Sequence, residues 1–452
     1  MKQKLWIIYF VLVIVCCVVI VTVWATRQAI TAGGARLPRP IGEAILKIVV
    51  FPSLVKQAFV KVTHPSKPMA LLLAKNQIDT SGWSEKFPDP SDNGYLLLSH
   101  VTHEDKQGVV SLIRISDGKQ IFKVVPDFSK IANSQKATRY FQISGKDWSM
   151  PIHPLLARNG DLIFSADGSL IRHSICEKKT LWQSDGSFHH SIEEDADGNI
   201  WVPSITSGSF PENKFLNEHL KDDAITKVSA NGVVLLRQSF ARILIDNDLR
   251  ALVLGHFGDV FNNDPVHMND ITPALSDGKF WKKDDLLISA RLSSGVFLYR
   301  PSTNKILWHK IGPWLGQHDA NFIGDHQISV LGNDAVNAMP NGSEFLRQND
   351  SNQIYLVDLQ TNTISTPYKE IMERLRLRTV SQGRATILDD GSAYFEETDN
   401  RRHVRFDKER LLWSRINLFD ADYLGAVSWG RYMTNDEVSK IIKAKPCLGR
   451  GL

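Results

Sequence analysis

Cysteine and metal-binding motifs are scarce in this sequence. Only 4 of its 452 residues are cysteine, and neither a C-x-x-C nor an H-E-x-x-H spacing occurs. These absences exclude the common zinc sites and the dithiol redox motif. A glycine-rich phosphate-binding loop is also absent, so no motif indicates a bound nucleotide. The motifs therefore predict neither a metal nor another cofactor.

An excess of charge of one sign is missing as well. The formal net charge is +4, and Lys2, Lys4 and Arg27 carry three of these charges without an acidic residue near them. The rest of the chain is close to neutral, which argues against a nucleic-acid-binding protein. Hydrophobic residues make up 43% and charged residues 23% of the chain, which is typical of a globular protein with a sizeable core.

Only one long apolar run is present, at residues 5–25. It contains no charge and is long enough to cross the hydrocarbon core of a bilayer as a helix. Because Lys2 and Lys4 precede it, residues 1–27 are predicted to be a cytoplasmic flank and a single-pass anchor, with the main domain periplasmic or extracellular. The alternative is a cleaved signal peptide, although the run is long for one and Val23-Trp24-Ala25 is a poor cleavage site.

Two of the cysteines, Cys16 and Cys17, fall inside this apolar run. The other two, Cys176 and Cys447, belong to the part of the chain predicted to lie outside the cytoplasm. In such a compartment they either form a disulfide or remain free thiols, and their spacing does not decide between the two.

The rest of the chain divides into a neck and one large β-rich domain. Residues 28–85 have the composition of a linker with a helical or extended neck. From residue 86 to residue 452, short β-rich runs alternate with Asn-Gly and Asp-Gly pairs, the strongest short-range signal for hairpins. Glu370 to Arg378 is the one convincing helical insertion.

Many short antiparallel strands over so long a stretch predict an all-β fold, a β-propeller. A two-sheet sandwich would be unusually large. The signatures of WD and kelch repeats are absent, so the motifs alone do not give the number of blades.

Four segments of the β-rich domain carry the side chains suited to chemistry. They are Phe188–Ile192, Asp264–Ile271, Leu286–Arg291 and Gly316–Ala320. The inner strands of a propeller converge on its axis, so we expect these segments to meet in one pocket there. The side chains predicted to line it are His190, His267, Asn269, Arg291 and His318.

Strand alternation guides the choice within these segments. His267 and Asn269 are two residues apart, so on a strand they project from one face, whereas the adjacent His189 and His190 point to opposite faces. Convergent donors of this kind favour an anionic ligand such as sulfate or phosphate. Histidines could instead hold Zn²⁺ or Cu²⁺, although arginine and asparagine are poor neighbours for a cation.

Taken in order, these segments resemble a known family. The pattern H-x-N-[SD]-I at residues 267–271, then I-S-x-R at 288–291 and Q-H-D at 317–319, resembles the bacterial arylsulfotransferases, the PAPS-independent aryl-sulfate sulfotransferases. The resemblance covers roughly residues 150 to 410. It implies a six-bladed propeller outside the cytoplasm that moves a sulfuryl group from a phenolic sulfate ester to a phenol through a sulfohistidine.

The resemblance also implies a role for each candidate residue. His318 would be the nucleophile, Arg291 would bind the sulfuryl oxygens, and His267 would exchange protons with the phenols. His190 and Asn269 would bind substrate. The implied partners are an aryl sulfate donor, a phenolic acceptor and, through the N-terminal helix, the membrane; a homodimer is open.

Two other functions remain open from the residues. The first is a non-catalytic propeller that binds an anionic or aromatic ligand, or a protein partner, at the cell surface. The second is a metal-dependent hydrolase or lyase that uses the histidines as ligands. A propeller fold is compatible with all three functions, so the site must decide between them.

Overall fold

The computed structural model describes Trp24 and residues 71–73, 86–131, 149–255, 261–337, 345–347 and 349–451. The chain separates into two compact units, Met1–Met69 and Ala70–Leu452, and the fold below is that of the second. The predicted anchor, apart from Trp24, and most of the predicted neck lie outside the described residues. Within the described part of the chain, no helix is both long and apolar enough to cross a membrane.

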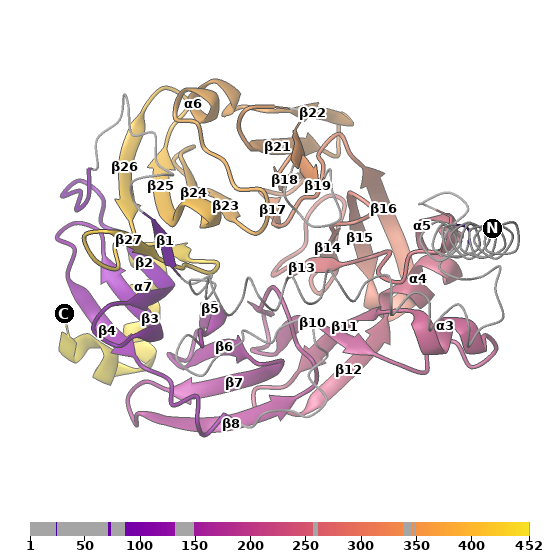
Figure 1. Cartoon of the computed structure of the whole chain (residues 1–452), viewed down its shortest axis with the longest axis horizontal. Coiled ribbons are helices and arrows are strands. Elements are labelled where there is room, and N and C mark those ends of the chain that lie inside the picture. The colour runs from indigo at the N-terminus through magenta and orange to yellow at the C-terminus, as the bar shows by residue number, and fades with distance from the viewer. Residues whose placement is uncertain are drawn as a thin grey trace, which may run out of the picture. The chain divides into compact units, whose positions relative to one another are not determined.

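Six four-stranded antiparallel sheets surround a central axis (Figure 1). Two of them, listed from the axis outward, are β28 (Arg431–Met433), β2 (Tyr95–Thr102), β3 (Gln107–Arg114), β4 (Gln120–Val124); and β5 (Ile152–Leu156), β6 (Leu162–Ala166), β7 (Ser169–Ser174), β8 (Lys179–Asp185). The next two are β9 (Glu193–Glu194), β10 (Ile200–Thr206), β11 (Asp222–Val228), β12 (Val234–Ser239); and β13 (Met268–Pro273), β14 (Leu286–Ala290), β15 (Gly295–Arg300), β16 (Lys305–Ile311). The last two are β17 (Ala320–Ile323), β18 (Gln327–Gly332), β21 (Gln353–Asp358), β22 (Thr363–Ser365); and β23 (Arg384–Ile387), β24 (Ala393–Glu397), β25 (Arg402–Phe406), β26 (Leu411–Ile416).

The chain is therefore the all-β propeller that the sequence predicts, with the six blades that the family resemblance implies. The sandwich alternative is wrong. Two short ribbons accompany the blades: β1 (Leu71–Leu73) pairs with β27 (Tyr423–Gly425), and β19 (Ala335–Asn337) pairs with β20 (Phe345–Arg347).

Burial along the strands follows their distance from the axis. The second strands β6 and β14, with sequences LIFSA and LLISA, are buried along their whole length because neighbouring blades cover both of their faces. The outermost strand β16 alternates exposed and half-buried residues, as expected where one face meets solvent. The turn at Asp167-Gly168 joins β6 to β7 with φ of 48° and 78°, the left-handed pair predicted for a two-residue hairpin loop.

Helices occupy connections between strands and the segment after the last strand, β28. They are α3 (Lys214–His219), α4 (Phe240–Asp246), α5 (Ala251–Leu254), α6 (Lys369–Arg374) and α7 (Asn435–Ala444), with short 3-10 turns η3 (Pro301–Thr303), η4 (Thr398–Asn400) and η5 (Pro446–Gly451). The helix predicted at residues 370–378 is α6. It ends early because Arg376 adopts a left-handed conformation with φ of 49°. Its Ile371 and Met372 are buried, while Glu373 is exposed.

The two ends of the β-rich domain close the ring together. The late strand β28 pairs with the early strand β2, in the register Tyr95↔Met433. Helix α7 follows at once and begins with a capping box between Thr434 and Glu437. Its Val438 and Ile441 pack into the core shared by the blades of β2 and β6.

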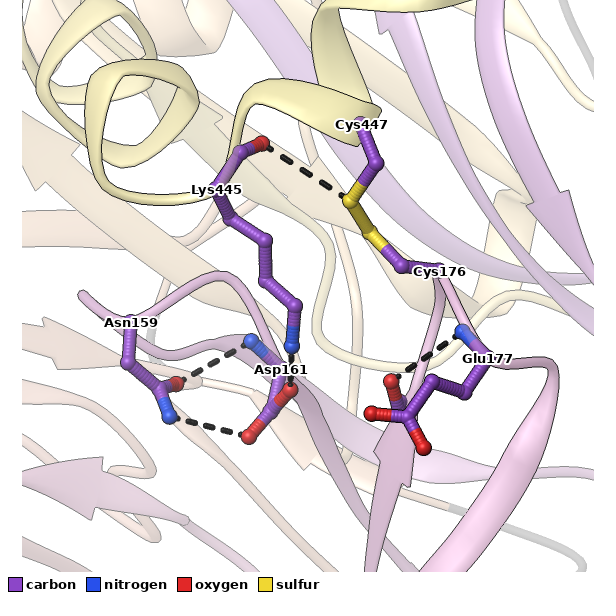
Figure 2. The surroundings of a disulfide bond; sticks show 7 residues. Asn159, Asp161, Cys176, Glu177, Lys445 and Cys447 are labelled. Atoms are coloured by element: carbon purple, nitrogen blue, oxygen red, sulfur yellow. Dashed lines mark hydrogen bonds and ion pairs between the residues drawn. A yellow bond between two sulfur atoms is a disulfide. The ribbon is translucent and has the colours of Figure 1, made fainter.

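A disulfide fastens this C-terminal segment (Figure 2). Cys176 and Cys447 are joined across a sequence separation of 271, with their Cα atoms 6.0 Å apart. Beside the disulfide, Lys445 pairs with Asp161, which also accepts from Arg172 Nε at 2.9 Å. Of the two options open from the sequence, the structure has the disulfide.

Candidate active site at the propeller axis

Each blade enters its inner strand through a residue in the left-handed conformation. These residues are His153 (φ 53°), His190 (55°), His267 (49°), Gly316 (58°), Gln382 (59°) and Trp429 (47°). Non-glycine residues adopt this conformation uncommonly, and five of these six are not glycine. Backbone strain repeated around one axis marks this ring as a candidate functional site.

Aromatic side chains from successive blades meet in this ring. The ring centre of His153 lies 4.3 Å from that of Trp429 and 6.0 Å from that of His190. The centre of His190 lies in turn 5.4 Å from that of His267. We call His153, His190, His267, Arg291 and His318 the histidine layer.

His318 stands just before β17 and is almost fully buried. Its ring forms a hydrogen bond with Asn333, with 2.7 Å between Nδ1 of His318 and Oδ1 of Asn333. Asn333 Nδ2 donates to the carbonyl oxygens of Thr379 and Gln382, which fixes the orientation of the amide and leaves Oδ1 toward the imidazole. Nδ1 of His318 therefore carries the proton. The carbonyl oxygen of Gly316, 3.1 Å from Nδ1, is a second acceptor for it.

The other nitrogen of His318 consequently has a lone pair. The backbone N–H of Gln382 donates to Nε2 at 3.0 Å. Burial, and after it the charge of Arg291, lower the pKa of His318 well below its ordinary value. The ring is thus a neutral imidazole with a defined tautomer, the form in which a histidine can act as a nucleophile.

His267 forms a pair with a carboxylate. Its Nδ1 lies 2.8 Å from Asp264 Oδ2, and Lys221 Nζ approaches the same oxygen at 2.8 Å. Burial would raise the pKa of Asp264, but His267 and Lys221 lower it to about 2. The ionised carboxylate keeps the proton of His267 on Nδ1 and leaves Nε2 as the nitrogen that can exchange one.

Arg291 follows β14 directly and is partly buried. Among the described residues its guanidinium group has no hydrogen-bond partner, and burial lowers its pKa while the charge of Asp264 raises it. A Cβ placed on Gly316 would lie 3.9 Å from Arg291 Nε, so the guanidinium lies beside the loop that carries His318. Its N–H groups remain available to a bound anion.

The expected strand alternation does not hold for the histidines. His189 and His190 were expected to point to opposite faces, yet their Nδ1 atoms lie 2.8 Å apart. The left-handed conformation of His190 turns its side chain back toward its neighbour. His267 and Asn269 do not share a regular strand face either, because His267 precedes β13 and the register shifts between Met268 and Asp270.

Asn269 is fully buried and reaches the loop of His318 by another route. Its Nδ2 donates to the carbonyl oxygen of Gln317 at 3.1 Å, while its Oδ1 has no partner among the described residues. The structure thus brings the five predicted side chains together at the axis. They interact electrostatically or through hydrogen bonds with neighbouring groups of the site.

Three residues that the sequence reasoning did not single out complete the site: Asn333, Asp264 and His153. Asp264 is the first residue of the segment Asp264–Ile271 and stands three residues before His267, whereas Asn333 lies outside the four segments, in the sequence VLGND. His153 also lies outside them; only its position at the entry to β5 reveals it.

Farther along the same inner strands lies a second group, the ion layer of Glu193, Arg384 and Arg431. Glu193 Oε1 accepts from Arg384 Nη1 at 3.0 Å, and its two oxygens accept from Arg431 Nη1 and Nη2 at 3.0 Å each. Burial would raise the pKa of Glu193, but the two guanidinium groups outweigh it and lower the pKa. This layer joins β9, β23 and β28 across the axis.

No group of three or more histidine, cysteine or acidic side chains suited to a metal ion occurs in the described part of the chain.

The family model of arylsulfotransferase (ASST) matches residues 154–417, more than half of the chain. No relative among curated protein sequences matches.

Solved structures resemble the chain only distantly. A protein of unknown function from Bacteroides caccae is 12% identical, with a TM-score of 0.44, over 75% of this chain and 99% of its own. The β-propeller domain of Cps50 (Swd1) from Myceliophteria thermophila is 9% identical, with a TM-score of 0.40, over 78% and 90%. A streptogramin B lyase is 13% identical, with a TM-score of 0.37, over 78% and 90%.

Proposed function

Because the chain belongs to the arylsulfotransferase family, we propose that it moves a sulfuryl group from a phenolic sulfate ester to a phenol through a sulfohistidine at His318. The observation that carries this proposal is the tautomer of His318. Asn333 holds the proton of His318 on Nδ1, so Nε2 has the lone pair. The loop that carries His318 lies beside the guanidinium group of Arg291.

In the first half of the reaction, His318 Nε2 attacks the sulfur of the donor. The N–S bond forms as the bond from sulfur to the aryl oxygen breaks, and its electron pair leaves with the phenolate. Arg291 donates to the sulfuryl oxygens, where charge is spread in the transition state. The Nδ1–H bond to Asn333 strengthens as the imidazole becomes positive.

His267 is the general acid that protonates the leaving phenolate. Phenols have a pKa of about 10, so the departing phenolate takes up a proton readily near neutral pH. His267 supplies it from Nε2 in its doubly protonated form and becomes neutral, with its remaining proton on Nδ1 beside the carboxylate of Asp264. In the second half the acceptor phenol gives its proton to an imidazole of the histidine layer and its oxygen attacks sulfur. The N–S bond breaks, and its electron pair returns to Nε2 of His318.

The N–H of Gln382 must leave Nε2 before the N–S bond can form. A sulfuryl oxygen bound at this position would take over the N–H as its own hydrogen-bond partner, so the donor group would not be left unpaired. Substrate binding thus replaces one acceptor by another at Gln382.

We also propose that the apolar run at residues 5–25 anchors the protein and that the propeller lies outside the cytoplasm. The disulfide between Cys176 and Cys447 supports this location, because disulfides persist in oxidising compartments. After cell fractionation the full chain should stay with membranes at high salt and alkaline pH. Recovery of a soluble chain that begins near residue 26 would favour the cleaved signal peptide.

The test of the catalytic proposal uses the full-length protein purified in detergent with 4-nitrophenyl sulfate. The wild type should give a burst of nitrophenol, a histidine adduct of the mass of one SO₃ group on His318, and faster release when phenol is added. His318→Ala should bind the ester without a burst or adduct. Normal turnover by His318→Ala would refute the covalent mechanism.

One observation favours the non-catalytic alternative. His318 is only 2% exposed and its nucleophilic nitrogen already has a partner in Gln382, which is the arrangement of a structural histidine. In that case the propeller binds aryl sulfate at Arg291 without consuming it. A wild type that binds the ester but gives neither burst nor adduct would establish this alternative.

A further inference from the structure

Asp223, His189 and His190 form a continuous row behind the histidine layer. Asp223 Oδ1 lies 3.3 Å from His189 Nε2, and His189 Nδ1 lies 2.8 Å from His190 Nδ1. Asp223 and His189 are both almost fully buried. Asp223 stands on β11, whereas the two histidines precede β9, so the row joins two strands of one blade to the axis.

The contacts of Asp223 set the direction of this row. Its Oδ2 accepts from the backbone N–H of Met268 at 2.7 Å, so the carboxylate serves as an acceptor. The contact between Asp223 Oδ1 and His189 Nε2 is an ion-pair contact rather than a hydrogen bond, and the negative charge favours the tautomer of His189 with its proton on that nitrogen. His189 Nδ1 then has a lone pair, His190 Nδ1 donates to it, and the lone pair of His190 is on Nε2.

We propose that Asp223, His189 and His190 form a proton relay that takes the proton of the acceptor phenol, an inference that rests on the proposed sulfotransferase function. The phenol proton moves to His190 Nε2 while the Nδ1 proton of His190 moves to His189 Nδ1. The phenolate oxygen then attacks sulfur, and the N–S bond of the sulfohistidine breaks. His190 is the catalytic base, and His189 and Asp223 are positioning residues.

The relay places the positive charge where the structure can hold it. His190 faces His153, His267 and His318 as well as His189, and burial together with these imidazoles lowers its pKa well below the ordinary value. A charge kept on His190 would be unfavourable there. The carboxylate of Asp223 lies beside His189, the ring to which His190 passes its proton.

The proton can afterwards return to the start of the cycle. The first half of the reaction consumes a proton from His267, and the second half delivers one to His190. The two rings are neighbours, with centres 5.4 Å apart. Transfer from His190 to His267 restores both groups, so the enzyme needs no proton from outside for a complete transfer between phenols.

Asp223→Asn is the sharpest variant for the test. The asparagine oxygen can still accept from the Met268 N–H, so its amide group turns N–H bonds toward His189 Nε2. This reverses the tautomer of His189, which then donates to His190 and shifts the proton of His190 to Nε2. His189→Gln is a second variant that keeps hydrogen bonding but cannot carry a proton, and the exposed His309 on β16 gives the matched control His309→Gln.

The experiment follows the full chain in detergent with 4-nitrophenyl sulfate as donor. The acceptors are phenol and a chlorinated phenol that is ionised at the assay pH. Asp223→Asn and His189→Gln should keep the nitrophenol burst and transfer to the chlorinated phenolate at the wild-type rate. Transfer to phenol should fall about a hundredfold, the usual scale for losing a general base. His309→Gln should match the wild type throughout.

The outcomes separate the relay from the function beneath it. An active wild type whose variants keep the burst but lose transfer to both acceptors equally, or to neither, overturns the relay and leaves the sulfohistidine mechanism intact. A wild type that forms no adduct overturns both. A variant that does not fold is recognised by loss of the burst, and the other variant then decides the question.

Discussion

The histidine layer and the ion layer come from the same inner strands, yet they treat buried polar groups in opposite ways. His190 belongs to one and Glu193, three residues later, to the other. In the ion layer Glu193 is charged and is matched by Arg384 and Arg431. In the histidine layer burial keeps His190 and His318 neutral, helped by the neighbouring imidazoles at His190 and by Arg291 at His318, and hydrogen bonds fix which nitrogen has the lone pair.

The contrast separates two tasks at one axis. Matched charges tie three blades together and leave no group free to react, whereas neutral imidazoles with set tautomers offer lone pairs and protons in defined directions. We therefore expect changes in the ion layer to affect folding and changes in the histidine layer to affect turnover.

The largest effect is expected in the ion layer, from Glu193→Gln. The variant removes the negative charge and one acceptor oxygen from the carboxylate that Arg384 and Arg431 both contact, and the charge of Asp319 is left to face two buried guanidinium groups. Breaking a buried ion pair in this way costs about 3–5 kcal/mol of stability. Chemical denaturation should show the loss. The control is Glu373→Gln on the exposed face of α6, and equal stability of the two variants would contradict a structural role for the ion layer.

The next largest effect is expected in the histidine layer, from Arg291→Ala. Loss of one donor to a transition-state oxyanion typically costs about 3 kcal/mol, so kcat/KM for 4-nitrophenyl sulfate should fall by more than a hundredfold. Stability should change little because the guanidinium group has no hydrogen bond to any described residue. Arg291→Lys, which keeps the charge but not the planar fork, should give an intermediate rate. A large loss of stability in Arg291→Ala with normal turnover would show that Arg291 serves folding rather than catalysis.

A change outside both layers sharpens the contrast further. Cys447→Ser opens a disulfide that spans 271 residues, and such cross-links typically contribute about 2–4 kcal/mol. Thermal unfolding should occur at a lower temperature, while kcat and its pH dependence should match the wild type. Cys176→Ser and the double variant should be destabilised by the same amount as Cys447→Ser. A change in kcat would mean that the closure of the ring controls the site.

The smallest effect concerns pH and the pair of Asp264 and His267. The folded protein holds the pKa of Asp264 at about 2, below its ordinary value of 3.8, so ionised Asp264 stabilises the fold. This contribution, about 2 kcal/mol, is complete above pH of about 4 and is lost as pH falls toward 2. Asp264→Asn should abolish that part of the acid dependence. The free energy of unfolding should be measured against pH for both proteins. Identical profiles would show that His267 does not lower the pKa of Asp264.

Much of this architecture can be predicted from local signals. Asn-Gly and Asp-Gly pairs such as Asp167-Gly168 report the hairpins directly, because positive φ is a property of the residues themselves. The ring closure by β2 and β28, and the contact between Cys176 and Cys447, could not be predicted in the same way. Each joins segments hundreds of residues apart whose sequences carry no record of the pairing.

The site shows the same division. The histidines that belong to motifs can be predicted from the sequence. The expected alternation of His189 and His190 is wrong, because His190 adopts a left-handed conformation that cannot be predicted from its residue type. Asn333 was missed since it lies 15 positions from His318 in sequence and meets it only through the pairing of β17 with β18. Tautomers and proton paths depend on such second partners.

Ring closure also imposes an order on biosynthesis. Arg431 meets Glu193 across a sequence separation of 238, so the axis stays incomplete until nearly all of the propeller has left the ribosome. A nascent or truncated chain that stops before β28 presents β2 as an open edge strand, a ready template for aggregation and an accessible substrate for proteases. Only a chain synthesised through β28 covers that edge, so the last inner strand protects the first blade from aggregation and proteolysis.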